Sequence, residues 1–273
     1  MYLKDGRQTL DPKLDRIPQF DERSRGYPVT AALLADSESL RPRSKAWRLT
    51  KRPALDQGAE GACVGFAVTN ELLAAPVEVR FGSWSTAQRF ARESIYWEAQ
   101  KIDPWPGGSY PGADPFYEGT SVLAGVKVAK RLGYFDSYRW AFSLRDLVLG
   151  IGYEGPALLG MNWYFGMYFP DKNHFIRPAG EFVGGHAIVA RGVKLVSKPY
   201  PKWLQKDSWA RAIFSHPRRW EDVDLDRSYV LLRNSWGDDH GDGGDIKMTL
   251  SDLEWLLQQQ GEAVFFLNRT LPA

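Results

Sequence analysis

Cysteine and long apolar runs are what this sequence most clearly lacks. Its 273 residues include a single cysteine, so no disulfide can form within the chain. No apolar run approaches the roughly 20 residues that a transmembrane helix needs, and the first residues, MYLKDG, lack the apolar core of a signal peptide. We therefore expect no membrane partner and no secretory leader.

Excess charge is also missing. The formal net charge is only +2 at pH 7, which argues against nucleic acid as the main partner. Apolar residues, in contrast, make up 44% of the chain and include 14 Phe, 12 Tyr and 11 Trp, enough for a substantial core. At this length the chain fits one large domain or two lobes that share a cleft.

The lone cysteine, Cys63, lies where a turn is predicted to lead into a helix. Apolar residues follow it at helical spacing until Pro76 ends the pattern. A thiol at a helix N-terminus feels the positive end of the helix dipole, which favours the nucleophilic thiolate. Gln57 stands before it, where a side-chain amide can stabilise an oxyanion beside the sulfur. A lone cysteine is otherwise most often buried and inert, so the interpretation depends on its partners.

Two later segments supply those partners. His186 follows Gly184 and Gly185 and opens an apolar, β-branched run, which predicts a histidine at the mouth of a buried strand with room for a ligand chain. Asn234 ends a second apolar run and is followed by Trp236 and a turn glycine. Glutamine, cysteine, histidine and asparagine in this order are the constellation of a thiol nucleophile with its base and orienting group.

The three segments resemble those of the papain-like (C1) cysteine peptidases, in a form similar to compact bacterial or viral members. Residues 57–63 are similar to the family's glutamine-to-cysteine segment, residues 185–187 to its histidine strand and residues 234–237 to its asparagine block. The resemblance covers residues 40–268. It implies an α+β fold in which a helical lobe and an antiparallel β lobe enclose the active-site cleft. Because such peptidases often carry disulfides and this chain cannot, we expect an intracellular protein, cytoplasmic or, if phage-encoded, virion-associated.

The resemblance also implies roles. Cys63 would form a thioester acyl-enzyme, His186 would act as base and acid, Asn234 would orient His186, and Gln57 would bind the oxyanion. No cofactor or metal is implied, and the partner is a polypeptide substrate, cut by an endopeptidase. The implied substrate contacts are Gly107, Gly108, Gly184, Gly185 and Trp236, of which the first two stand where the family has a groove-lining glycine pair.

The sequence departs from the family pattern at four positions near these motifs. Glu60 replaces a common disulfide cysteine, and Val64 replaces the aromatic residue that usually follows the nucleophile. His240 and Asp245 stand in the asparagine block where tryptophan and tyrosine are usual. None of these four differences replaces one of the predicted reacting groups, but all four are expected to change the shape of the cleft. The acidic, glycine-rich run at 238–245 does not complete the spacing of a calcium loop.

The predicted organisation has three parts. Residues 1–37 form a polar arm or short prosegment, residues 38–155 a helical lobe with the nucleophile, and residues 156–273 a β lobe with the histidine and asparagine. Helices are predicted after Cys63, at about 85–101, after a cap at Thr120, after a cap at Ser143 and after a capping box at Ser251. Strands are predicted at 156–163, 185–193, 228–234, 245–250 and 262–268.

An insertion at about 194–227 separates the histidine and asparagine strands. It is basic and tryptophan-containing at first and acidic at its end. His186 starts one strand and Asn234 ends the other, so in an antiparallel pair the insertion emerges away from the cleft. It is a solvated appendage or a docking surface for a protein or, as a minority alternative, nucleic acid.

Two other functions stay open. One is a different papain-like acyl transfer, such as amidase or transglutaminase activity, against which the asparagine block argues. The other is a non-catalytic binding or virion structural protein on the same scaffold, which the unusual arm and the insertion keep open. The arm itself is either packed across the body, cleaved as a prosegment, or used for docking.

Overall fold

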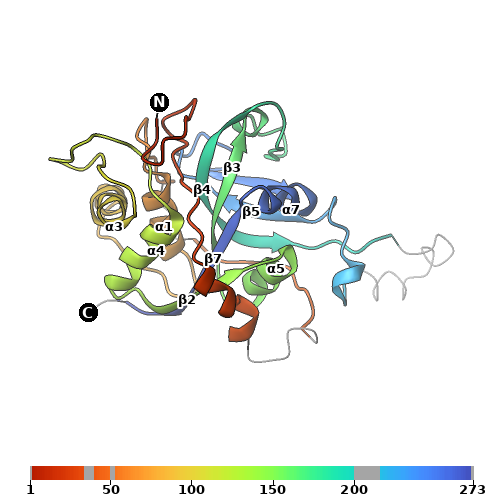
Figure 1. Ribbon diagram of the computed structural model, residues 1–273. Helices are drawn as coiled ribbons and strands as arrows, with labels where there is room; N and C mark the ends of the chain where they lie inside the picture. The colour runs from red at the N-terminus through yellow and green to blue at the C-terminus, as the bar shows by residue number, and fades with distance from the viewer. Residues whose placement is uncertain (1, 34–39, 50–52, 200–215, 272–273) are drawn as a thin grey trace.

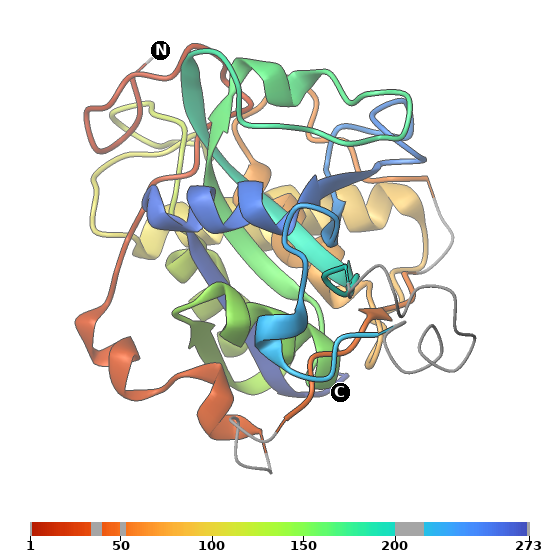
Figure 2. The same ribbon diagram turned by 90° about the vertical axis from the view of Figure 1, so that its right-hand side faces the viewer.

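The computed structural model describes residues 2–33, 40–49, 53–199 and 216–271. Helices lie on both sides of one twisted antiparallel sheet (Figures 1 and 2). In Figure 1, α1, α3 and α4 are on one side of strands β3 and β4, and α7 is on the other. The N-terminal segment, red in Figure 1, runs between α1 and β4. None of the helices in the described ranges is both long enough and apolar enough to cross a bilayer.

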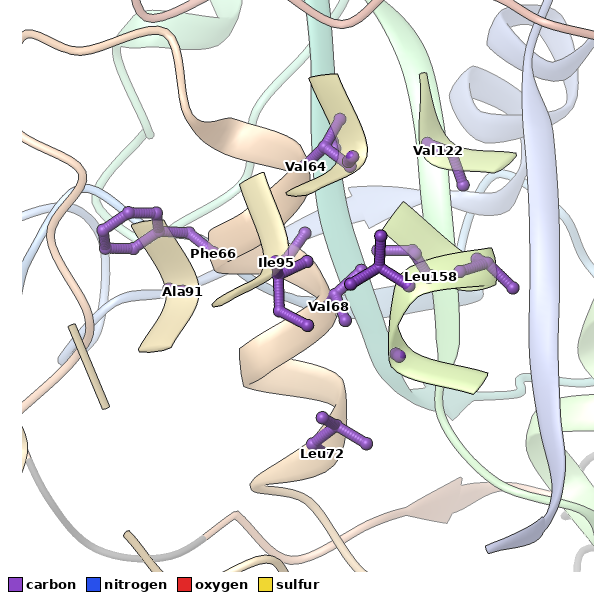
Figure 3. Close-up of a cluster of buried hydrophobic side chains, with 14 of the residues drawn as sticks. Val64, Phe66, Val68, Leu72, Ala91, Ile95, Val122 and Leu158 are labelled. Carbon is purple, nitrogen blue, oxygen red and sulfur yellow. The ribbon is translucent and has the colours of Figure 1, made fainter. Parts of the chain in front are cut away.

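The helical side is built around α1 (Cys63–Leu72), every residue of which is buried. Beside it runs a continuous helical stretch of α2 (Trp84–Arg89), the π-helical η3 (Phe90–Trp97) and α3 (Glu98–Ile102), followed by α4 (Val122–Arg131). Gly65 lets α1 approach η3 closely, because a Cβ there would lie 2.2 Å from the Ala91 carbonyl oxygen. Figure 3 shows the resulting apolar contacts, which join Val64, Phe66, Val68, Leu72, Ala91, Ile95, Val122 and Leu158.

The sheet has the order β2-β7-β3-β4-β5-β6, with β1 (Lys45–Ala46) paired to β4. Its strands are β2 (Phe135–Ala141), β3 (Ala157–Tyr164), β4 (Phe182–Lys194), β5 (Tyr229–Arg233), β6 (Asp245–Thr249) and β7 (Glu262–Arg269). All five strands predicted from the sequence are present. Strand β2 was not predicted; it pairs with β7, and most of its side chains are only half-buried.

Successive side chains of β4 point to opposite faces of the sheet and pack into two different cores. Ala187 and Val189 pack into the cluster around α1, whereas Ile188 and Ala190 pack into a second cluster. Residues of α5 (Leu144–Tyr153) and α7 (Leu250–Gln258) complete the second cluster, and Figure 2 shows both helices on this face. β2 and α5 thus pack with the sheet although they precede residue 155, where the sequence suggested that the β lobe begins.

Two helix caps were predicted one or two residues away from where they lie. The cap of α4 is Ser121, whose hydroxyl accepts from the Ala124 N–H at 3.0 Å. Thr120 does not cap because its hydroxyl donates to Asp103 at 2.8 Å. The cap of α7 is Thr249 rather than Ser251. Ser143 caps α5 as predicted, although the helix extends to Tyr153.

The pairing of β4 with β5 places the histidine and asparagine together. The two strands are antiparallel, with Ala190 opposite Leu232 and Lys194 opposite Tyr229. His186, near the start of β4, and Asn234, just past β5, therefore share one end of the pair. The insertion leaves the other end, as predicted, and its two described ends meet where Lys198 N–H donates to the Asp222 carbonyl at 2.8 Å. The middle of the insertion, 200–215, lies outside the described residues.

Candidate active site

Cys63 is the first residue of α1 and is fully buried. Its thiol donates a hydrogen bond to Asp15 Oδ1 at 2.9 Å. Burial, with the charge of Asp15 and this hydrogen bond, holds the pKa of the thiol well above its usual value, against the opposing effect of the Ala187 backbone N–H. In this state the helix dipole does not produce the thiolate that the sequence suggested, because burial of the thiol, together with the Asp15 carboxyl group, outweighs it.

His186 is buried on β4 and is oriented by Asn234. Its Nε2 lies 2.8 Å from Asn234 Oδ1, which also accepts from the Ser235 N–H at 2.8 Å. An amide oxygen only accepts, so the neutral ring carries its proton on Nε2 and a lone pair on Nδ1. Nδ1 has no hydrogen-bond partner among the described residues. Burial lowers the pKa of His186 to about 4, against the effect of the Asn234 bond.

Trp236 packs against the ring of His186. Its ring centroid is 5.0 Å from that of His186, and Trp163 meets the imidazole edge-on at 4.8 Å and the Trp236 ring at 5.3 Å. Tyr168 stacks on Trp236 at 5.5 Å, with the rings 17° from parallel. The imidazole therefore sits among rings that exclude water and keep its hydrogen bond to Asn234 strong.

Gln57 belongs to a segment that is paired with the asparagine block. The Gln57 N–H donates to the Ser235 carbonyl at 2.9 Å, and the Gly237 N–H donates to the Leu55 carbonyl at 3.1 Å. The side-chain amide of Gln57 donates to the carbonyl oxygens of Lys13 at 3.1 Å and Glu60 at 3.0 Å. A peptide carbonyl thus already lies at the donor that was predicted to hold an oxyanion.

Residues 9–17, which we call the cleft segment, run between the two walls. On the β wall the N–H groups of Leu10 and Arg16 donate to the carbonyls of Val183 and Gly185, at 3.0 and 3.1 Å. On the helical wall the N–H of Ile17 donates to the Thr120 carbonyl at 2.9 Å. The segment therefore binds both walls through its backbone, although it turns at Asp11–Leu14, where the Leu14 N–H donates to the Asp11 carbonyl at 3.0 Å.

Glycines make room for this backbone. A Cβ at Gly185 would lie 2.3 Å from the Arg16 carbonyl oxygen, and one at Gly184 would lie 2.6 Å from the Leu14 Cβ. On the opposite wall, a Cβ at Gly61 would lie 2.6 Å from Asp15 Oδ2. Because any larger residue would collide with the cleft segment, these positions form a groove that fits a peptide main chain.

Two buried ion pairs anchor the arm. Arg16 Nη2 lies 2.8 Å from Glu262 Oε1 on β7, and Lys4 Nζ lies 2.7 Å from Asp103 Oδ1 on the helical side. These side chains are essentially inaccessible to solvent. Breaking a buried pair by removing one partner typically costs about 3–5 kcal/mol, so the arm is held to both walls.

Asp15 is the residue of the arm that reaches the nucleophile. One carboxyl oxygen accepts from the Cys63 thiol, and the other accepts from the Tyr96 hydroxyl at 3.3 Å. Burial raises the pKa of Asp15 well above its usual value, and the charge of Glu118 adds to the rise, although the bonds from Cys63 and Tyr96 oppose it. The Cys63 thiol is therefore hydrogen-bonded to the Asp15 carboxyl group, whose ionisation is itself unfavourable in this buried position.

The structure brings most of the predicted site residues together: Gln57, Cys63, Gly184, Gly185, His186, Asn234 and Trp236. Gly107 and Gly108 make close contacts within their own loop: added Cβ atoms there would meet Pro115 and Tyr110. The wall they were predicted to line meets the cleft segment at Thr120 instead.

Asp15, Gly61 and Thr120 were missed, because nothing local in the sequence marks a residue that is defined by a contact across the cleft. The acidic run at 238–245 is used internally: Asp238 accepts from the Ala54 N–H at 2.7 Å and Asp245 pairs with Arg191. No group of three metal-ligating side chains forms within the described ranges.

Comparison with known proteins decides the fold. No family model and no curated protein sequence matches the chain. Among solved structures it is similar to xylellain, a cysteine protease from Xylella fastidiosa, at 14% identity and a TM-score of 0.60, over 97% of this chain and 98% of that one. This chain has the papain-like fold. A digestive procathepsin L2 proteinase from Tenebrio molitor also matches, at 17% identity and a TM-score of 0.48, over 94% of this chain and 79% of that one.

The papain-like fold confirms the predicted α+β architecture of helices and an antiparallel sheet. A structural match at this low sequence identity shows the fold alone, so activity has to be argued from the site. The papain-like cleft of this chain holds a cysteine, a histidine with a free Nδ1, and an amide donor, all on fixed elements. Such a set can carry out nucleophilic acyl transfer.

Proposed function

We propose that the chain is a cysteine peptidase that hydrolyses peptide bonds. One observation carries the proposal: a segment of this chain already lies across the cleft, bound through its backbone to both walls, with the Lys13 carbonyl oxygen on the Gln57 amide. A groove that accepts a main chain in this way suits a polypeptide substrate better than a small amide. The oriented imidazole supports catalysis rather than binding alone.

The reaction follows the general course of thiol acyl transfer. The Cys63 thiol loses its proton to His186 Nδ1, and the sulfur attacks the carbonyl carbon of the scissile bond. Gln57 and the Cys63 N–H hold the oxyanion, a role worth on the order of 3 kcal/mol per donor. The imidazolium then protonates the leaving amine, which leaves a thioester. Water gives a proton to His186 and attacks the thioester, releasing the acid and restoring the thiol.

The structure is that of a closed form, and we propose that the arm makes the peptidase latent. The cleft segment blocks three parts of the site at once. Asp15 binds the Cys63 thiol, the Lys13 carbonyl accepts from the Gln57 amide, and the backbone of the segment fills the groove. Any substrate must displace it. This favours an inhibitory arm over one that only packs or docks, and it leaves open whether the arm is cut or swings away.

Leu14→Asp tests both parts of this proposal. Leu14 is fully buried, so a charge there disfavours the closed form strongly while the catalytic groups stay untouched. We expect the variant to label at Cys63 with a peptidyl epoxide and to hydrolyse a denatured protein substrate much faster than the unaltered chain. Leu10→Asp is the matched control, because Leu10 belongs to the same segment but is 67% exposed.

Two further variants complete the test. Adding Cys63→Ala or His186→Ala to Leu14→Asp is expected to abolish hydrolysis, with labelling lost in the first and slowed in the second. A folded Leu14→Asp protein whose thiol reacts with a small alkylating agent, yet which cuts no peptide in a diverse library, would refute the peptidase. The non-catalytic binding scaffold would then be the better description.

A further inference from the structure

We propose that His240 is a positioning residue that orients the Asn234 amide and thereby fixes the working tautomer of His186. The role deepens the proposed peptidase function and rests on it. Three side chains form a hydrogen-bonded series: His240 Nδ1 lies 3.2 Å from Asn234 Nδ2, and Asn234 Oδ1 lies 2.8 Å from His186 Nε2. The three residues come from the strand β4, the end of β5 and the turn that follows it.

Amide orientation matters because the two ends of an asparagine side chain have opposite hydrogen-bonding character. With Oδ1 toward His186, the ring must carry its proton on Nε2, so Nδ1 is free to accept the thiol proton. With the amide turned over, Nδ2 would face Nε2 and favour the tautomer whose Nδ1 already holds a proton. Such a histidine could not act as the base toward Cys63.

His240 favours the productive orientation in a way that few residues can. Neutral histidine with its proton on Nε2 offers Nδ1 as an acceptor, which matches the Nδ2 end of Asn234. An indole at this position would offer only a donor. The Ser235 N–H supports the same orientation from the other end, at 2.8 Å from Asn234 Oδ1. His240 therefore gives the Nδ2 end of Asn234 a partner, as His186 and Ser235 do for the Oδ1 end.

The turn that carries His240 is constructed to hold it there. The Asn234 N–H donates to the Gly244 carbonyl at 2.9 Å. This bond joins the two ends of the turn at Asn234, the residue that His240 contacts. Gly241 has a φ of +79°, and a Cβ there would lie 2.2 Å from the Asp245 carbonyl oxygen. Trp236 meets the His240 ring edge-on at 4.7 Å. The imidazole thus occupies a defined place against Asn234.

The surroundings keep His240 neutral at ordinary pH. Burial lowers its pKa to about 4, and the charge of Lys13 acts in the same direction, against the opposing effect of a hydrogen bond with the Tyr168 backbone. His186, whose pKa is also lowered, lies close to it. Nδ1 is therefore an acceptor throughout the range in which a thiol and an imidazole can work together.

Nitrogen NMR tests the arrangement without any need for activity. The chain has only four histidines, so protein labelled with ¹⁵N in histidine gives an assignable set of ring signals with the help of single His→Gln variants. We expect both His240 and His186 to be neutral with the proton on Nε2 at pH 7. His240→Phe, which keeps a ring beside Trp236 but offers no acceptor, is expected to shift the His186 nitrogens and broaden them. A His240 that carries its proton on Nδ1 would overturn the proposal.

Kinetics then test the consequence in the Leu14→Asp background, where the cleft is open. His240→Phe is expected to lower kcat about five-fold, as the loss of one net hydrogen bond would, with KM unchanged. His240→Gln, whose Oε1 can accept, should recover at least half of the rate. In an Asn234→Ala background the His240→Phe change should cost less than two-fold.

Several outcomes would count against the role. An equal loss with and without Asn234, or a loss confined to KM, would place the effect of His240 elsewhere. If no variant hydrolyses peptide, the peptidase proposal fails, but the NMR result still decides whether His240 orients Asn234. The two proposals can therefore fail separately.

Discussion

The closed form should lose stability as pH rises, and Asp15 is the main reason. In the closed form burial holds the pKa of Asp15 well above its usual value, whereas in an open arm the carboxyl would titrate near 3.8. The protonated carboxyl therefore favours closure. That stabilisation is fully present below about pH 3.8 and is lost as pH rises through the raised value of the closed form.

The neighbours of Asp15 act in the same direction. The pKa values of Cys63 and Tyr96 are raised well above normal, and that of Glu118 is raised, in each case with burial as the largest cause. Ionising any of them also favours the open arm. One titrating group changes the ratio of closed to open forms about ten-fold per pH unit, or about 1.4 kcal/mol.

Alkylation of Cys63 by iodoacetamide, followed by intact mass, measures this ratio. At each pH, the alkylation rate of the unaltered chain is divided by the alkylation rate of Leu14→Asp. This quotient no longer depends on the intrinsic reactivity of the thiol and reports the fraction of the chain that is open. We expect this quotient to rise about ten-fold per unit between pH 5 and the pKa of the closed form. Asp15→Asn keeps the shape but cannot ionise, so its quotient should stay lower and rise less steeply with pH than that of the unaltered chain.

The reasoning would be refuted by a quotient that is constant from pH 4 to 8, or that rises as pH falls. It would also be refuted if Asp15→Asn opened as readily as the unaltered chain at pH 7, because the buried carboxylate is what destabilises the closed form. Circular dichroism at each pH separates arm opening from unfolding.

Two further changes address the groove and a helix cap. Gly61→Ala should expose Cys63 to iodoacetamide at neutral pH, since its Cβ would collide with Asp15 and with the Pro12 carbonyl. Gly82→Ala is the control and should leave the alkylation rate unchanged, because a Cβ there meets nothing within 4 Å. Equal alkylation rates for the two variants would contradict the fitted groove. Thr249→Ala should lower the free energy of unfolding, measured by urea denaturation, by about 1 kcal/mol through loss of the α7 cap. Ser251→Ala should lower it by much less. The reverse order would show that Ser251 is the cap.

The sequence predicted which candidate residues meet in the site, because each of them lies in a segment whose local pattern carries information. Cys63 begins a recognisable helix, His186 opens an apolar strand, and Asn234 ends another. Their convergence followed from the antiparallel pairing of two adjacent strands. No comparable pattern marks Asp15, whose neighbours in sequence are unremarkable for an exposed arm and whose position depends on contacts with residues 48 or more positions away.

The displaced caps show the same limit at smaller scale. Thr120 and Ser121 are adjacent hydroxyl residues, and local sequence cannot decide between them. The choice depends on Asp103, which takes the Thr120 hydroxyl and is itself paired with Lys4 of the arm. Strand β2 was missed because it lies at the edge of the sheet and alternates imperfectly between buried and exposed side chains.

The pairing of residues 55–57 with residues 235–237 has a mechanical consequence. It joins the oxyanion donor to the strand end that orients the histidine, through the bonds from Gln57 to Ser235 and from Gly237 to Leu55. Relative motion of the two walls is therefore restricted at this end of the groove, and we expect Gln57 and Asn234 to keep their spacing when the cleft opens.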